Sequence, residues 1–80
     1  MKYVYLLESI SNPGKRYVGI TGDLKKRTAE HNAGRSPQTR KYTPWRCAVA
    51  VCFADHAKAR TFERYLKSGS GHAFAKRHFW

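Results

Sequence analysis

The stretch YVYLLESISNPGKRYVGIT, residues 3–21, decides the fold. Two runs rich in β-branched and aromatic residues flank a polar turn that contains Pro and Gly, so we predict strands over 2–8 and 16–20. The connection between them is short, and the two strands are therefore expected to pair antiparallel. Tyr5 and Tyr17 then share one face if the register between them is even.

The remaining elements follow from helix-boundary and turn residues. A helix is expected within 21–34, because Asp23 or Thr21 can cap its first amides and Asn32-Ala33-Gly34 is typical of a helix end. A basic loop (35–44), a buried third strand (45–53), a helix (56–67), a Ser-Gly-Ser-Gly break (68–71) and a short final helix or tail (72–80) complete the prediction. The expected fold class is α+β, a small three-stranded, mostly antiparallel sheet flanked by helices in the order ββαβα(α), as one domain over 1–80.

The charge balance indicates the type of partner. Sixteen Lys and Arg residues oppose five Asp and Glu residues, which gives a net charge of +11 in a chain of 80 residues. Such a bias is typical of proteins that bind polyanions, above all nucleic acids. The chain has neither a membrane-spanning apolar stretch nor a signal-peptide core. We therefore expect a cytoplasmic protein that binds a nucleic acid, DNA or RNA, and that does not bind membranes.

Cys47 and Cys52 lie five residues apart in the predicted third strand. On a regular strand their side chains point to opposite faces and cannot easily bridge each other. They are expected to be reduced packing residues. Neither a Cys-x-x-Cys pair nor a spaced histidine pair supports a zinc site.

The first predicted helix contains one large apolar residue, Leu24, and so can bury little hydrophobic surface. Arg27 and His31 are spaced to share a face with Leu24. One interpretation is a solvated helix in which Arg27 pairs with Glu30. The other is a phosphate-binding face, since Arg donates two parallel hydrogen bonds to phosphate and His transfers protons near neutral pH.

Glu63 is the carboxylate whose place in a predicted helix has no capping role. It could form ion pairs with Arg60 and Lys67, at i−3 and i+4, which contribute about 0.2–0.5 kcal/mol each. Alternatively, it could hold a divalent cation, because Mg²⁺ is often bound by one or two carboxylates together with waters and substrate phosphates.

Cations and aromatic rings alternate in the segment 35–46, which is a pattern of nucleic-acid contact. Its members are Arg35, Arg40, Lys41, Tyr42, Trp45 and Arg46. Trp45 is expected in the core and the cations outside. The Ser-Gly-Ser-Gly run either cradles a phosphate with its backbone amides or simply breaks the helix.

Taken together, these residues resemble the GIY-YIG endonuclease superfamily, and in particular its small stand-alone bacterial members. The motifs are Tyr3-Val4-Tyr5, Tyr17-Val18-Gly19, a T-x-D-L-x-x-R-x-x-x-H-N pattern from Thr21 to Asn32, Pro44-Trp45, and E-x-Y-L-K-S-G from Glu63 to Gly69. They occur in order over nearly the whole chain.

The resemblance implies a role for each of these residues. Tyr5 and Tyr17 would be the tyrosines of the site, with Tyr5 as general base. Arg27 would stabilise the phosphate, His31 would be an auxiliary acid, base or phosphate contact, and Glu63 would bind Mg²⁺ or Mn²⁺. A phenol is a poor base at pH 7, so Tyr5 is expected to have a pKa lowered by cations or metal-bound water. Gly19 is expected where a side chain would clash with Tyr5 or with the substrate backbone.

The sequence thus predicts a metal-dependent endonuclease that hydrolyses DNA phosphodiester bonds, with branched or damaged DNA and DNA repair as the context. Further nucleic-acid contacts are expected from Lys26, Arg35, Arg40, Lys41, Arg46, Lys67 and Ser70. The alternative is a nucleic-acid-binding module that keeps the fold without catalysis.

Overall fold

The computed structural model describes all 80 residues and contains three strands and three α-helices. The elements are β1 (Lys2–Ser9), β2 (Arg16–Thr21), α1 (Leu24–Asn32), the short 3-10 helix η1 (Arg40–Tyr42), β3 (Trp45–Phe53), α2 (His56–Leu66) and α3 (Gly69–His78). The predicted α+β class and element order are confirmed. None of the helices has the combination of length and apolar character that crossing a bilayer requires.

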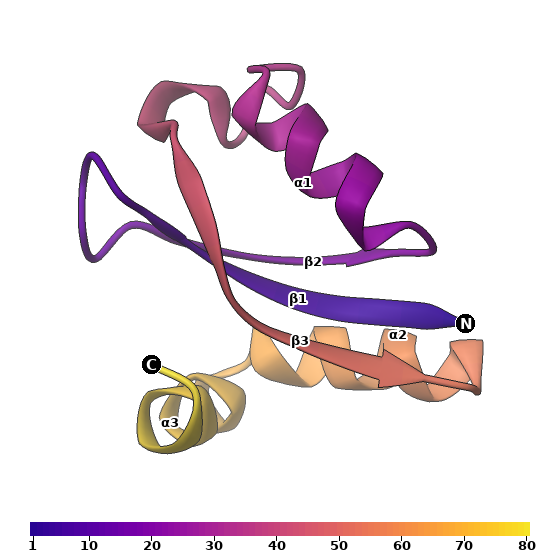
Figure 1. Ribbon diagram of the computed structural model, residues 1–80. Helices are drawn as coiled ribbons and strands as arrows, with labels where there is room; N and C mark the ends of the chain where they lie inside the picture. Colours follow the sequence, from indigo (N-terminus) through magenta and orange to yellow (C-terminus); the bar gives the residue numbers. More distant parts are fainter.

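The sheet has the order β2-β1-β3, and β1 is antiparallel to both neighbours. Figure 1 shows α1 over one face of this sheet and α2 and α3 over the other. The central strand is therefore covered on both sides, which explains why four consecutive residues of β1 (4–7) are buried.

The two faces of β1 contribute to two separate cores. Val4 and Leu6 pack with Ala59, Leu66 and Ala75 of α2 and α3. Burial of a side chain of this size stabilises the fold by about 1.5–3 kcal/mol. On the opposite face, Tyr5, Leu7 and Trp45 form a smaller core beneath α1. The alternation of β1 therefore separates an apolar face from a face rich in tyrosine.

The expectation that residues 45–53 form a buried strand is wrong as to burial. β3 exists with the predicted bounds, but it is an edge strand, and Trp45 is its one buried residue. The error arises because apolar content does not distinguish a central from an edge strand. The central position belongs to β1, whose own sequence is less uniformly apolar.

The expected orientation of Cys47 and Cys52 is also wrong. A bulge lies between the pairs Leu6–Val49 and Leu7–Cys47, so Ala48 is an extra residue on β3. Cys47 then lies opposite Leu7 and Cys52 opposite Tyr3, and these partners are four residues apart on one face of β1. Both thiols are free and exposed, so they are not packing residues.

The helix break expected at 68–71 is confirmed at Ser68, which separates α2 from α3, whereas Gly69, Ser70 and Gly71 already form the first turn of α3. The Ser68 hydroxyl caps α3 by accepting a hydrogen bond from the Gly71 amide, at 3.2 Å. α3 packs tightly at this point, since a Cβ atom on Gly71 would lie 1.7 Å from the Tyr65 carbonyl oxygen of α2. The missing side chain of Gly71 thus allows the two helix backbones to come into direct contact.

Candidate active site

The β1–β2 hairpin positions the two tyrosines of the predicted site. Its register places Tyr5 opposite Gly19 and Leu7 opposite Tyr17. Tyr5 and Tyr17 are therefore diagonal neighbours on the α1 face, as an even register requires. Their ring centroids are 6.3 Å apart.

Gly19 provides the room that the Tyr5 ring occupies. A Cβ atom at this position would lie 2.4 Å from both Cζ and the hydroxyl oxygen of Tyr5. Real side chains do not make contacts this short, so alanine here would displace the tyrosine. The expected clash with Tyr5 is confirmed, and it explains the glycine within a strand.

α1 contributes His31, whose side chain is completely buried against the tyrosines. The Nε2 atom of His31 is 2.8 Å from the Tyr5 hydroxyl oxygen. Its ring centroid lies 5.7 Å from that of Tyr5 and 5.0 Å from that of Tyr17. His31 is the one fully buried residue of α1, so this helix is bound to the sheet by a polar side chain.

Thr39 completes a hydrogen-bonded chain that the sequence did not reveal. Its Oγ1 atom is 2.7 Å from Nδ1 of His31 and 3.5 Å from the carbonyl oxygen of Ser36. A carbonyl only accepts, so the Thr39 hydroxyl donates to it and accepts a hydrogen bond from Nδ1–H. In neutral His31 the Nε2 atom is then the acceptor, and Tyr5 donates its proton to it.

The position of Thr39 is fixed by the start of β3. The indole Nε1–H of Trp45 donates to the Thr39 carbonyl at 2.7 Å. The Asn32 side chain in turn accepts from the Trp45 amide at 2.6 Å and donates to the Trp45 carbonyl at 3.1 Å. Trp45 is buried as predicted, and it connects the end of α1 with the loop before β3. The clue in the sequence was the pairing of a helix-end asparagine with a following Pro-Trp.

The electrostatic environment of Tyr5 differs from the expectation. Burial raises the pKa of the Tyr5 phenol above its usual value of 10, although the nearby Arg27 guanidinium opposes this shift. The predicted lowering of this pKa is therefore wrong for the protein alone. The physical reason is that Tyr5, 1% exposed, has lost the water that would stabilise a phenolate.

The pKa of His31 shifts in the opposite direction. Burial, reinforced by the positive charge of Arg27, lowers the pKa of His31 below its usual 6.5. The imidazole is therefore neutral at pH 7, in agreement with the hydrogen-bond directions above. A neutral imidazole bound to a phenol O–H is arranged to accept its proton.

This lowered pKa makes stability dependent on pH. Between the lowered pKa of folded His31 and about 6.5, the unfolded chain binds more protons than the folded chain, so the free energy of unfolding falls as the pH falls. The largest slope from one group is about 1.4 kcal/mol per pH unit. We expect urea unfolding to show this loss below pH ~6.5.

The matched control for the pH dependence is His31→Gln, which removes the titrating group. Its unfolding free energy should be nearly constant over the same pH range. An equal slope in the variant and the unmodified protein would contradict the assignment to His31.

Arg27 makes both of the contacts that were considered for its helix face, the ion pair with Glu30 and the approach to the tyrosines. Its guanidinium forms an ion pair with Glu30 at 3.2 Å, and it also acts on the Tyr5 phenol. The Arg27 side chain is 33% exposed, so it can reach solvent and a bound anion. The solvated helical pair and the position beside the tyrosines therefore occur together.

Glu63 comes from the opposite layer of the fold. It is 8% exposed and shares the buried face of α2 with Ala59 and Leu66. Its carboxylate forms an ion pair with Lys67 at 2.5 Å, whereas Arg60 does not pair with it. No hydrogen bond or ion pair joins Glu63 to the tyrosines, Arg27 or His31. The structure thus brings four of the five predicted catalytic residues together, whereas Glu63 comes from α2, which covers the opposite face of the sheet (Figure 1).

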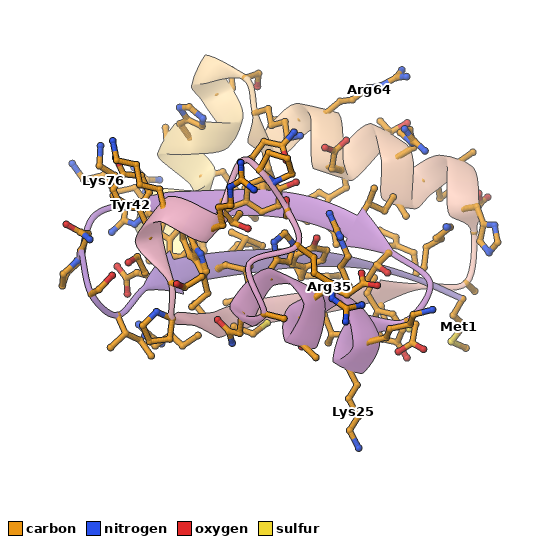
Figure 2. All side chains as sticks on the ribbon, turned by 90° about the horizontal axis from the view of Figure 1, so that it is seen from above. Met1, Lys25, Arg35, Tyr42, Arg64 and Lys76 are labelled. Atoms are coloured by element: carbon orange, nitrogen blue, oxygen red, sulfur yellow. The ribbon has the colours of Figure 1, made fainter.

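The predicted nucleic-acid contacts are all on the surface. Lys26, Arg35, Arg40, Lys41, Arg46, Lys67 and Ser70 are exposed. Two of them are engaged within the protein, since Arg46 pairs with Glu8 at 2.6 Å and Lys67 pairs with Glu63. Figure 2 shows Arg35 above the sheet, in the loop that follows α1.

Comparison with known proteins accounts for this arrangement. The family described as the GIY-YIG catalytic domain matches residues 1–77. The chain belongs to the GIY-YIG family. The motif residues identified in the sequence are therefore those of the family, and the sheet, the tyrosines and α1 form the GIY-YIG fold.

The chain is similar to relatives of two types, and one of them is an endonuclease subunit. The chain is 37% identical, over 94% of its length, to the structure-specific endonuclease subunit SLX1 of Candida dubliniensis, and it covers 27% of that protein. It is 43% identical, over 64% of its length, to a UPF0213 protein of Streptococcus pyogenes, of which it covers 50%. A UPF0213 protein of Haloquadratum walsbyi is 36% identical over 82% of this chain. The chain thus spans about a quarter of the yeast subunit and half of the streptococcal protein.

Proposed function

We propose that this GIY-YIG protein is a divalent-metal-dependent endonuclease that hydrolyses phosphodiester bonds in DNA. The observation that carries the proposal is the buried chain from the Tyr5 hydroxyl through His31 to Thr39, with Arg27 beside it. A buried tyrosine and histidine at hydrogen-bond distance can act as an acid–base pair in catalysis. The net charge of +11 favours a polyanionic substrate.

Because its pKa is raised, Tyr5 is a protonated phenol at neutral pH, so it can act as a base only if it passes its own proton on in the same step. Water attacks phosphorus while the Tyr5 oxygen accepts its proton, and the phenol proton passes to Nε2 of His31. His31 becomes an imidazolium whose Nδ1–H remains bonded to Thr39. The proton on His31 is later returned through Tyr5 to the leaving oxygen or to solvent.

Arg27 supplies positive charge where the phosphate becomes more negative. Tyr5 is nearly inaccessible in the free protein, so the substrate must displace part of its cover. Arg27 has a long and partly exposed side chain that can exchange Glu30 for the phosphate oxygens. Two parallel hydrogen bonds from a guanidinium to phosphate are stronger than those of a surface ion pair.

Glu63 is the residue that would hold the metal ion. Glu63 supplies one carboxylate, and no cluster of three His, Cys, Asp or Glu side chains is present to add further protein ligands. Mg²⁺ accepts one carboxylate with waters and substrate phosphates as its other ligands. A bound Mg²⁺ or Mn²⁺ supplies charge stabilisation to the transferring phosphate. In the free protein Lys67 forms an ion pair with the carboxylate of Glu63, so metal binding requires Lys67 to move.

The test is cleavage of supercoiled, linear, branched and single-stranded DNA in Mg²⁺ or Mn²⁺. Glu63→Gln keeps the size of the side chain but removes the anionic ligand, and we expect cleavage to fall at least about a hundredfold, a range typical of losing one charge-stabilising group. Asp55→Asn is the matched control, since it removes one negative charge from the N-cap of the same helix, a position that asparagine also caps. Undiminished cleavage by Glu63→Gln would remove Glu63 from the mechanism.

A non-catalytic nucleic-acid-binding module is the second candidate. It is favoured by the ion pair between Glu63 and Lys67 and by the position of α2 on the opposite face of the sheet. DNA binding without cleavage of any of the four substrates, in either metal, would establish this second function and overturn the first.

A further inference from the structure

A second basic site lies on the sheet face away from the tyrosines. It is a cavity of about 480 Å³ between the β1–β2 hairpin and α3. The basic part of its lining consists of Lys15, Arg16, His72 and Lys76, and no Asp or Glu side chain lines it. Basic side chains gathered in a concave surface attract anions strongly, because their electrostatic potentials add.

Two of these cations have no anionic partner within the protein. Neither Lys15 nor Lys76 takes part in any of the four ion pairs. Two contacts orient the guanidinium of Arg16. It lies 4.6 Å from the centroid of the Trp80 ring, and it makes a loose ion pair of 3.6 Å with Glu8. The cavity therefore combines unpaired ammonium groups with a fixed guanidinium and an indole.

The cavity is continuous with the basic surface on the tyrosine side. Lys15 lines the cavity, and its Nζ atom also lies 5.3 Å from the centroid of the Tyr42 ring in η1. Lys41 contacts the same ring at 5.7 Å. Figure 2 shows Tyr42 and Lys76 at the same end of the molecule, although they come from different layers. Cations thus extend around the hairpin turn from the loop before β3 to α3.

The cavity also borders the proposed metal ligand. Leu66 forms part of its lining and lies three residues after Glu63 on the buried face of α2. Glu63 and this part of the lining are thus within about one turn of α2 of each other.

We propose that the cavity binds the backbone of a single-stranded segment that leaves the duplex next to the cut site. Its volume is typical of pockets that take one small ligand, so it has room for part of a single strand but not for a duplex. Cations combined with an aromatic ring are typical of single-strand sites. This inference rests on the proposed function for the position of the cut, and it specifies the substrate as DNA with a single-stranded branch.

The test measures binding without cleavage, by fluorescence anisotropy in EDTA. A blunt duplex is compared with the same duplex carrying a short single-stranded tail, and the protein should prefer the tailed DNA by about tenfold, since the tail adds phosphate contacts. The double variant Lys15→Ala/Lys76→Ala should lose this preference. When the double variant binds the isolated single strand, the slope of log K against log salt concentration should be shallower by about 1.4 than for the unmodified protein, because two phosphate contacts are lost.

The matched control is Lys25→Ala/Lys58→Ala, which removes the same charge from exposed positions outside the cavity. Figure 2 shows Lys25 directed away from the rest of the molecule. Retention of the tail preference by the cavity variant, an equal loss in the control, or no preference in the unmodified protein would each overturn the proposal. A cavity-dependent preference in a protein that cleaves no DNA would support the cavity and overturn the proposed nuclease alone.

Discussion

Gly71→Ala should be the most destabilising single methyl group that can be added to this protein. The new Cβ atom would lie 1.7 Å from the Tyr65 carbonyl oxygen and 2.6 Å from the Leu66 Cα atom, both of which belong to the backbone of α2. A backbone cannot rotate away as a side chain can, so α3 must move off α2. Overpacking costs about 1–3 kcal/mol and occasionally more, and we expect the upper end, about 3 kcal/mol. For a domain of this size, that lowers the melting temperature by about 12–24 °C.

Gly69→Ala is the matched control for this prediction. It lies two residues earlier in the same helix turn, and a Cβ atom there would meet nothing within 4 Å. Since alanine is favoured over glycine in a helix by about 0.5–1 kcal/mol, its stability should be unchanged or slightly higher. Thermal unfolding followed by circular dichroism compares the two variants directly. Similar melting temperatures for both would show that α3 does not depend on the close approach.

Tyr5→Phe should have the largest effect on activity. The variant keeps the buried ring and removes the hydroxyl that donates to His31 at 2.8 Å. Loss of a general base lowers the rate about 10²–10⁴-fold. The variant also leaves Nε2 of His31 buried without a partner, which costs about 1–3 kcal/mol of stability. Single-turnover cleavage in Mg²⁺ measures the first effect, and urea unfolding measures the second.

Two further variants separate chemistry from packing. Tyr3→Phe lies on the same face of β1 and removes a hydroxyl without a hydrogen-bond partner, so cleavage should be unaffected. If Tyr5 and His31 act as one unit, adding His31→Gln to Tyr5→Phe should cause little further loss of rate. A Tyr5→Phe protein that is folded and retains more than about a tenth of the activity would exclude Tyr5 as the base.

The fold could be predicted from the sequence wherever local signals were strong. The hairpin turn, the Asp23 cap and the glycine after α1 each specify their conformation within a few residues, and the corresponding elements are as expected. The burial of β3 could not be predicted, because the order of strands depends on long-range pairing. The same applies to the cysteines, whose orientation is reversed by one bulged residue, Ala48.

The site was predictable to the extent that its residues lie on regular elements. Tyr5, Tyr17, Arg27 and His31 follow from strand and helix periodicity once the fold class is known, and the structure brings them together. Thr39 was missed because it lies in a loop whose path depends on the contacts of Trp45 and Asn32. The direction of the pKa shift of Tyr5 was missed for a related reason, since the degree of burial is a property of the assembled layers.

The way in which α1 is attached has a consequence for how the protein moves. The end of this helix is fixed by hydrogen bonds from His31 and Asn32, while its start has Leu24 as its apolar contact with the small core. Segments with few buried apolar contacts open at a lower free energy than the core that supports them. Arg27 and His31 can therefore separate from the tyrosines while the sheet stays intact. Amide protons of α1 would exchange with solvent during these local openings long before those of β1. The contacts between α1 and the tyrosines would therefore break and form again many times within the lifetime of one folded molecule.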